Sequence, residues 1–451
     1  MSEQQLAYEM LPPKFWQSTP WLARIRKTAL ARGAYPSAVL GVCVARMLML
    51  LPPNIVTPAY RGNYGTLNYY VAVVGESADG KGTAAAVAAQ LVPDFVGGNV
   101  GKVASGEAVA SQFAARVPDG EGRNAPTHVE MTRARVLLDV PEVCHFGASS
   151  SRIGSTLSPE LASGWSGGEQ LGASTKDGRN TITAPGYGYR LTMVTGVQDG
   201  NADALLSQST TGIPQRFLWV DTVDPEPLPD TVLDYDVVPL IEKAALPDVP
   251  EMTLQAAYRE GSLYSTIGCK TYFAVMEFPQ CVKRAVDDAR KQRNEEKRLG
   301  TTDGESTNGH RLLVQIKTAA AFAWLDYDRA NHMVVTEHDW RLAGMLLDYS
   351  DHVRDYVAEK LQTAATRKAA RAKLTHRAAE AATAADVEAV KNKVLAKVED
   401  AFGQPVTYKN VRNSITTRLR PFVRTALDEL CNDHQIVPVV GDDGTTRYTT
   451  A

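Results

Sequence analysis

Runs of apolar residues alternate with small and polar residues along the first half of the chain. Residues 14 to about 50 place apolar side chains at helical spacing, which predicts an N-terminal helical region over 1–60. From residue 67 onward, Val- and Leu-rich runs such as RARVLLDV and RLTMVTGV alternate with Gly-, Ser- and Ala-rich stretches. Continuous apolar runs of this kind are typical of buried parallel strands joined by helical crossovers. We therefore expect an α/β core over 61–230.

Helical patterns follow an acidic, proline-rich connection over 221–251. In HRLLVQIKTAAAFAWLDYD and TEHDWRLAGMLLDYSDHVRDYVAEKLQ, apolar residues recur three and four positions apart. Thr336 and Asp339 are placed to form a capping box at the start of the second helix. The pattern predicts a helical domain over 231–365, and a solvated helix rich in Ala, Lys, Arg and Glu over about 357–401.

The end of the chain combines short helices with two strands. The second of these helices has an apolar face that consists of Leu419, Val423, Leu427 and Leu430. Two strands joined by the turn GDDG come after it, and this order resembles a winged helix-turn-helix. Because Lys and Arg outnumber acidic residues over 366–424, we expect a basic helix and winged-helix module over 366–451.

The composition is that of a globular protein. Of the 451 residues, 44% are hydrophobic and 22% are charged, which excludes a disordered or fibrous protein. The chain starts with polar residues, and its most apolar stretch is interrupted by Arg46, so we expect a cytoplasmic protein without a membrane span. The five cysteines are scattered and include no Cys-x-x-Cys pair, which indicates reduced core residues. No metal is implied beyond one carried by a nucleotide.

The segment VAVVGESADGKGTAAAVAAQ carries the main chemical signal. An apolar strand leads into a glycine-rich loop and helix-forming residues lead out of it, which is the setting of a phosphate-binding loop. There the backbone N–H groups and the helix dipole hold phosphate oxygens, and a lysine reaches the β- and γ-phosphates. The expected nucleotide-binding residues are Gly75, Glu76, Ser77, Ala78, Asp79, Gly80, Lys81, Gly82 and Thr83.

The same loop leaves three interpretations open. Gly82 stands where the usual pattern has the Ser or Thr that ligates Mg²⁺, so Thr83 is the nearest hydroxyl. The order Gly-Lys-Gly-Thr is also that of adenylate-kinase-like loops. The loop by itself therefore fits an ATP hydrolase, a nucleotide kinase or a glycine-rich turn.

Polar residues follow two later strands of the predicted core. Asp139 and Glu142 end RARVLLDVPEV, at the sheet edge where a nucleotide would lie. We expect Asp139 to hold Mg²⁺ together with Thr83, and Glu142 to act as the base that orients the attacking water, which is the chemistry of hydrolysis. Thr195 and Gln198 lie at the end of RLTMVTGV, where they would sense the γ-phosphate or the water.

Arg216 lies between a turn that contains Gly and Pro and the apolar strand FLWV. A guanidinium in this place would reach the γ-phosphate of a neighbouring subunit as an arginine finger, and a surface salt bridge is the alternative. The expected catalytic residues are Lys81, Asp139, Glu142, Gln198 and Arg216.

In their order and spacing, these stretches resemble the P-loop ATPase family that forms the helicase-like half of actinobacterial and phage primase-polymerase proteins. The matching stretches are VGESADGKGT, RVLLDVPEV, STLSPELASGWSGGEQLGASTKD, VTGVQ and GIPQRFLWV. The resemblance implies a RecA- or AAA-like ATPase of the replicative helicase type, often a ring. It assigns phosphate binding to Lys81 and Thr83 and the acidic-strand role to Glu142, and it matches Arg216 to the arginine before Phe-Leu-Trp.

Two groups of cationic residues are candidates for DNA contact. Lys176 and Arg179 lie in STKDGRNTI, where a loop of a translocating ATPase would face single-stranded DNA in a central channel; a solvated hairpin is the alternative. Arg412, Arg418 and Arg420 lie on or near the presumed recognition helix, where they would contact DNA. Winged helices also dock proteins, so that alternative stays open.

Together these features predict a Mg-ATP-dependent ATPase that acts on DNA, such as a replicative helicase of a phage, plasmid or integrated element. We expect it to assemble as a ring, a hexamer, and to work with a separate primase or polymerase. The alternative is a non-motor ATPase that switches or loads partners in DNA replication or mobile-element maintenance. A nucleotide kinase ranks third, because it would need a lid and a second nucleotide site and the sequence signals neither.

Overall fold

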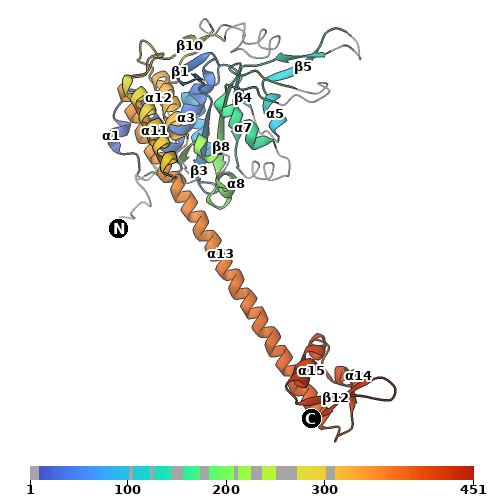
Figure 1. Cartoon of the computed structure of the whole chain (residues 1–451). Coiled ribbons are helices and arrows are strands. Elements are labelled where there is room, and N and C mark those ends of the chain that lie inside the picture. Colours follow the sequence, from blue (N-terminus) through green and yellow to red (C-terminus); the bar gives the residue numbers. More distant parts are fainter. Residues whose placement is uncertain are drawn as a thin grey trace. The chain divides into compact units, whose positions relative to one another are not determined.

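The computed structural model of the chain is drawn in Figure 1. It describes residues 10–100, 105–121, 125, 127–143, 156–172, 182–207, 212–224, 236–249, 272–300 and 310–451. The chain divides into two units, Met1–Leu361 and Gln362–Ala451. Each unit is described by itself below.

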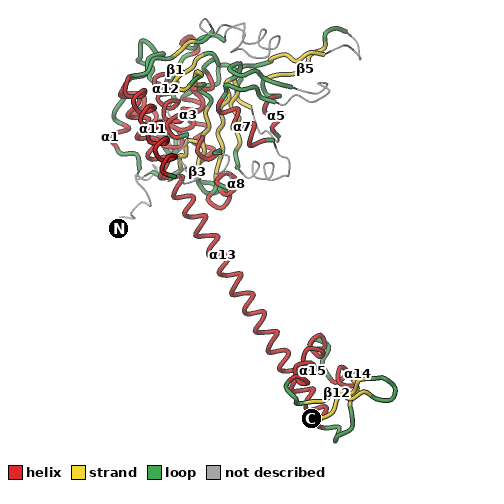
Figure 2. The backbone as a smooth tube through the Cα atoms, in the orientation of Figure 1, coloured by secondary structure: helices red, strands yellow, loops and turns green. Residues whose placement is uncertain are grey.

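Five parallel strands form the central sheet of the first unit (Figure 2). From one edge to the other they are β4 (Asn99–Val100), β7 (Arg135–Val140), β8 (Arg190–Val197), β3 (Tyr69–Val74) and β9 (Phe217–Asp221). Every residue of β3, β8 and β9 is buried, as expected for strands covered on both faces. The α/β fold with a parallel sheet that the sequence predicts is confirmed.

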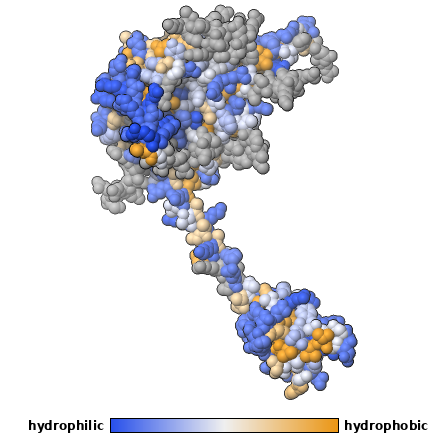
Figure 3. All heavy atoms as spheres, in the orientation of Figure 1, coloured by the Kyte–Doolittle hydropathy of each residue, from blue (hydrophilic) through white to orange (hydrophobic). Residues whose placement is uncertain are grey.

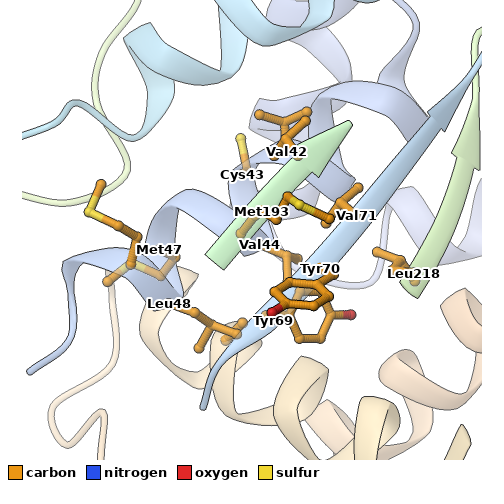
Figure 4. Close-up of a cluster of buried hydrophobic side chains, with 14 of the residues drawn as sticks. Val42, Cys43, Val44, Met47, Leu48, Tyr69, Tyr70, Val71, Met193 and Leu218 are labelled. Carbon is orange, nitrogen blue, oxygen red and sulfur yellow. The ribbon is translucent and has the colours of Figure 1, made fainter. Parts of the chain in front are cut away.

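Helix α3 (Pro36–Leu50) covers one face of this sheet. All of its residues are buried, and it packs against β3, β7, β8 and β9 and against α4 (Lys81–Leu91). Figure 4 shows side chains of α3, among them Val42 and Val44, packed with Val71 of β3 and Met193 of β8. The N-terminal helices therefore share one hydrophobic core with the sheet.

The other helices of the first unit complete both layers. Helices α1 (Pro13–Trp16), α2 (Pro20–Ala31) and α12 (Arg311–Leu325) belong to the α3 side, whereas α5 (Gly106–Ala110) and α7 (Leu157–Ser166) lie on the opposite face (Figure 1). Helix α8 (Asp203–Leu206) follows β8. Helix α11 (Gln280–Leu299) packs through Val282 and Val286 near Ile316 of α12.

Two small sheets accompany the central one. Strand β1 (Ile55–Arg61) pairs with β2 (Asn63–Gly65) and with β10 (Ala274–Val275). Strands β5 (Ala114–Pro118) and β6 (Thr127–Met131) form an antiparallel pair. Because β2 ends only four residues before β3 begins, β1 and β2 lie at the amino-terminal edge of the central sheet.

Helix α13 (Glu337–Glu399) begins in the first unit with the predicted capping box. The Thr336 N–H donates to Asp339 Oδ2 at 2.7 Å, and the Asp339 N–H donates to Thr336 Oγ1 at 3.2 Å, which confirms that prediction. The following part of α13 packs along the edge strand β9. There, the Trp219 N–H donates to Ser350 Oγ at 2.7 Å, so this side chain satisfies a backbone group of an unpaired strand edge.

The second unit has its own hydrophobic core. It contains the end of α13, β11 (Val406–Thr407), α14 (Tyr408–Ser414), α15 (Val423–Asn432), β12 (Ile436–Val440) and β13 (Thr446–Thr450). The strands pair antiparallel in the order β11-β13-β12. The predicted apolar set, Leu419, Val423, Leu427 and Leu430, is buried in this core. Within the described part of the chain, no helix combines the length and apolar composition of a membrane span.

Candidate functional site

A cavity of about 550 Å³ opens at the carboxyl-terminal edge of the central sheet. Its walls are residues 77–83, which run from the loop after β3 into the first turn of α4, the end of β7 with Asp139 and Glu142, and Gly196 of β8. These segments meet because β3, β7 and β8 are parallel neighbours and their carboxyl ends lie at one edge. The structure thus brings residues 77–83 of the expected loop and both expected carboxylates to one cavity, whereas Gly75 and Glu76 do not line it.

The 75–83 loop has the backbone of a tight, glycine-dependent turn. Gly80 adopts φ +82°, and Ala78 also has a positive φ of 72°. Lys81 is the first residue of α4, so the N–H groups of the first helical turn have no partner within the helix and point toward the loop. A helix start of this kind carries partial positive charge and is suited to hold an anion.

The side chains of the loop bond to its own backbone. Lys81 Nζ donates to the carbonyl oxygens of Gly75, at 2.6 Å, and Glu76, at 2.8 Å. The exposed Asp79 side chain accepts a hydrogen bond from the Glu76 N–H at 2.7 Å. The amides of Glu76 and Asp79 and the lysine ammonium are therefore engaged within the loop, and a phosphate would have to take over these contacts.

Two glycines allow the strands to approach the loop closely. A Cβ on Gly75 would lie 2.2 Å from Thr222 Oγ1, and a Cβ on Gly196 would lie 2.1 Å from the Pro141 carbonyl oxygen. The same Cβ on Gly196 would be 3.3 Å from Lys81 Cε, so β8 runs directly beside the lysine stem. Sequence reasoning missed Gly196, although a glycine inside a buried strand is a signal of close approach.

Asp139 is half-buried at the cavity wall. Burial raises the pKa of its carboxyl group, and the charge of Arg46 acts in the opposite direction. Arg46 comes from the otherwise apolar helix α3, and its Nε donates to the Val92 carbonyl oxygen at 2.7 Å. The sequence analysis did not connect Arg46 with the site, although an arginine inside a wholly buried helix calls for an acidic or carbonyl partner.

Glu142 and Gln198 meet across the ends of β7 and β8. Gln198 Nε2 donates to Glu142 Oε1 at 2.7 Å. Glu142 Oε2 is buried and has no hydrogen-bond partner among the described residues, and neither has Thr195 Oγ1. One carboxylate oxygen is thus held by an amide while the other can accept a hydrogen bond from a ligand or a water.

Asp221, at the end of β9, is a buried carboxyl group beside the loop that the sequence analysis did not single out. Burial raises its pKa to about 7, although the hydrogen bond from the Tyr349 hydroxyl lowers it. Asp221 pairs in register with Val74, the last residue of β3 before the loop. The sequence does contain a signal for Asp221, because an acidic residue directly follows the apolar run FLWV.

Arg216 lies far from this cavity in the same subunit. It precedes β9, whose first residue pairs with Tyr70 at the start of β3, so it lies at the amino-terminal edge of the sheet. Four residues of strand correspond to about 13 Å. The half-buried guanidinium donates to the Gly212 carbonyl oxygen at 2.7 Å and lies 5.6 Å from the centre of the Trp165 ring.

The candidate DNA-binding residues fall into two groups. Lys176 and Arg179 lie outside the described residues. Arg412 is exposed on α14, Arg418 pairs with Asp386 at 2.9 Å, and Arg420 is half-buried with its Nε on the Ile415 carbonyl oxygen at 3.1 Å. These arginines thus belong to α14 and the connection that follows it.

Helix α15 itself has a mixed exposed face. Arg424 and Thr425 lie there beside Asp428 and Glu429. The cationic surface of the second unit therefore comes mainly from residues before α15.

The donor set at the cavity suits a cation that is held mostly by a nucleotide. No group of three or more His, Cys, Asp or Glu among the described residues is arranged to hold a metal ion. Thr83 and Asp139 both line the cavity and offer one hydroxyl and one carboxylate. Mg²⁺ is commonly bound by one or two protein oxygens together with phosphates, so these residues fit Mg²⁺ delivered with ATP.

Comparison of the chain with protein-family models and with curated proteins finds no match.

Proposed function

We propose that this chain is a P-loop ATPase that hydrolyses Mg-ATP and acts on DNA. The observation that carries the proposal is the arrangement at the carboxyl edge of the sheet. Lys81 begins the helix after β3 and lines the cavity together with Glu142, which accepts a hydrogen bond from Gln198 at the end of the neighbouring strand β8. A lysine-headed helix start facing a carboxylate with one free oxygen suits phosphate binding combined with water activation.

Each residue has a role in this reaction. The N–H groups of the 75–83 loop and Lys81 Nζ would bind the β- and γ-phosphates of ATP. Mg²⁺, held by Thr83 and Asp139, would neutralise phosphate charge. Glu142 Oε2 would accept a proton from the attacking water, while Gln198 keeps the other carboxylate oxygen in place.

The ring assembly belongs to the same proposal. Arg216 lies at the amino-terminal edge of its own sheet and would act only on the nucleotide of a neighbouring subunit. Its contacts with Gly212 and Trp165 would have to be released or shared with the neighbour. We propose a hexamer in the cytosol, with single-stranded DNA in the channel and a separate primase or polymerase as partner.

The second unit supports a role in DNA or protein contact. Helices α14 and α15, the end of α13 and the three antiparallel strands follow the order of a winged helix. Arg412, Arg418 and Arg420 all precede α15 in the chain. We propose that the second unit binds DNA through these arginines.

A second candidate function is a non-motor ATPase that loads or switches a protein partner. It is favoured by the exposed apolar side chains of the edge strand β12, Val437, Val439 and Val440, which are 42%, 40% and 70% exposed. An apolar edge strand is more typical of a protein-docking surface than of a DNA-binding surface.

An ATPase assay with and without single-stranded DNA, together with a mass measurement of the assembly in ATP, tests the proposal. We expect Lys81→Ala to lose ATP binding and hydrolysis. Glu142→Gln should bind ATP but hydrolyse it at least about a hundredfold more slowly, because a general base is lost. Lys283→Ala, at an exposed lysine of α11, is the control and should keep full activity.

The outcomes separate the candidates. Hydrolysis that persists in Lys81→Ala would show that the site is assigned wrongly. Hydrolysis that does not respond to DNA in the intact protein would favour the loader over the motor. Transfer of the γ-phosphate to an added nucleoside monophosphate would favour a nucleotide kinase.

A further inference from the structure

A second cavity, of about 590 Å³, lies at the opposite edge of the central sheet. Its walls come from β1 and β2, from the segment before β8, and from α11 and α12. Since β2 leads into β3 and Tyr187 precedes β8, the cavity lies at the amino-terminal edge. It is therefore separate from the cavity beside Lys81, and its volume is in the range of cavities that take organic ligands.

Aromatic and amide side chains line this cavity beside the apolar side chains of α11 and α12. Tyr60, Tyr64 and Tyr187 line it, together with the amide side chains of Asn63 and Gln292. The Tyr60 ring is half-buried and packs edge-on against Phe278, with ring centres 6.3 Å apart, so its position is fixed. Aromatic rings and amides are the groups that stack on nucleobases and bond to their edges.

The mouth of the cavity is cationic. An adjoining hollow of about 500 Å³ shares Tyr60 and Arg293 with the first cavity and is also lined by Arg290 and Lys297. The three cations recur three and four positions apart, so they share one face of α11. Figure 3 shows a strongly hydrophilic patch over this helix.

Three other cations of the same helix are paired with acidic side chains. Lys283, Lys291 and Arg298 each lie within 4.0 Å of an acidic side chain of α11. Among the described residues, Arg290, Arg293 and Lys297 form no salt bridge, and all three are exposed. A row of unpaired cations that borders an aromatic cavity is complementary to a polyanion that carries flat rings.

We propose that this groove, formed by Tyr60, Tyr64, Arg290, Arg293 and Lys297, binds single-stranded nucleic acid. The cations would contact successive phosphates, and the bases would enter the tyrosine-lined cavity. The proposal rests on the proposed DNA-dependent function and assigns to it a contact surface in the first unit. An acidic peptide fits less well, because Glu169 and Glu296 also line the cavity and would repel carboxylates that enter it, whereas bases carry no charge.

Two matched triple variants of the full-length chain test the proposal. The groove variant carries Arg290→Gln, Arg293→Gln and Lys297→Gln. The control variant carries Lys283→Gln, Lys291→Gln and Arg298→Gln, which removes the same charge from positions of α11 that line neither cavity. Glutamine is a good helix former, and the positions are exposed, so both proteins should fold; thermal unfolding checks this.

Fluorescence anisotropy measures the affinity for labelled oligo(dT) of about 20 nucleotides, which exceeds the site size of a single binding module. We expect the groove variant to bind at least about tenfold more weakly at 0.15 M salt, and its slope of log K against log salt to flatten by about 2, which corresponds to three lost contacts with single-stranded phosphates. The control should keep the wild-type slope. Tyr60→Leu should weaken binding without changing the slope, because stacking is not a phosphate contact.

Equal losses in both triple variants, or competition by polyglutamate as strong as by unlabelled oligo(dT), would overturn the groove as a nucleic-acid site. ATP hydrolysis without DNA is measured on the same proteins. If wild type hydrolyses ATP but does not bind oligo(dT), the groove proposal fails while the ATPase stands. If wild type binds oligo(dT) through the groove but hydrolyses no ATP, the proposed ATPase fails and the groove stands.

Discussion

Asp221 makes the stability of the first unit depend on pH. Burial raises the pKa of this carboxyl group from its ordinary 3.8 to about 7. The unfolded chain would release this proton above about pH 4, whereas the folded unit keeps it up to about pH 7. Between these pH values the folded state binds more protons than the unfolded state. The free energy of unfolding therefore falls as the pH rises from about 4 to about 7.

The size of the effect follows from the width of that window. Each pH unit in which only the folded form holds the proton lowers the free energy of unfolding by about 1.4 kcal/mol. The free energy of unfolding therefore falls by about 3 kcal/mol between about pH 5 and pH 8. Asp221→Asn cannot ionise and therefore lacks this loss. Its amide oxygen can still accept the bonds from the Tyr349 hydroxyl and the Val223 N–H. Asp221 Oδ2 has no partner among the described residues, so the new amide nitrogen adds a cost that does not vary with pH.

Urea unfolding followed by tryptophan fluorescence measures this loss in the first unit alone. All six tryptophans lie within residues 1–361. ATP is omitted, since a bound ligand would add its own stabilisation. We expect the free energy of unfolding of Asp221→Asn, relative to wild type, to rise by about 3 kcal/mol from about pH 5 to pH 8. Asp203→Asn, at an exposed residue of α8, should show no such trend.

The reasoning would be refuted if the free energies of unfolding of wild type and Asp221→Asn differed by the same amount at every pH. Asp221 would then be ionised in the folded unit over the whole range from about pH 5 to pH 8. Tyr349→Phe gives an independent check. It removes the hydrogen bond that lowers the pKa of Asp221, so the loss of stability should extend to higher pH than in wild type.

Two further substitutions address the 75–83 loop. Gly196→Ala places a methyl group 2.1 Å from the Pro141 carbonyl oxygen and 3.3 Å from Lys81 Cε, so we expect a stability loss of about 1–3 kcal/mol and weaker binding of a fluorescent ATP analogue; unchanged binding would contradict the packing argument. Asp79→Asn removes a carboxylate that holds the Glu76 N–H beside the expected phosphates. Charges about 4 Å apart in water interact by about 1 kcal/mol, so the analogue should bind about fivefold more tightly, and weaker binding would show that Asp79 supports the loop instead.

The main strands of the central sheet were predictable because each is a short run of mostly apolar residues. YVAVV and FLWV are wholly apolar, RVLLDV and RLTMVTGV are mostly apolar, and a strand covered by helices on both faces needs no regular alternation of apolar and polar residues. Their carboxyl ends carry the loop, Asp139, Glu142 and Gln198, so the meeting of these residues also followed from the sequence. This part of the site depends only on parallel strands having their carboxyl ends at one edge.

The residues that the sequence did not reveal depend on which strands are neighbours. Gly196 touches Lys81 because β8 lies directly beside β3, and an order of strands cannot be derived from apolar runs. Asp221 is buried because α13, from much later in the chain, covers the edge strand that it ends. Arg46 influences Asp139 because α3 packs under the sheet rather than apart from it.

The groove was hidden for the same reason. Tyr60 and Arg293 are far apart in sequence, and each is unremarkable in its own segment. The cations of α11 look alike in the sequence, and only the structure shows that Arg290, Arg293 and Lys297 line the hollow beside Tyr60.

The two cavities lie at opposite ends of the same buried strands, which limits how they can be coupled. Strand β3 is packed on α3 and flanked by β8 and β9, so a packed sheet of this kind shifts as a body. Coupling would then run through segments that border both the sheet and a cavity. The segment that follows edge strand β9 is one of these, because Thr222 lies against Gly75 at the start of the loop. The backbone N–H groups of Trp219 and Asp221 in β9 donate to Ser350 and Tyr349 of α13. A nucleotide that displaces the end of β9 must either move this part of α13 or break those bonds.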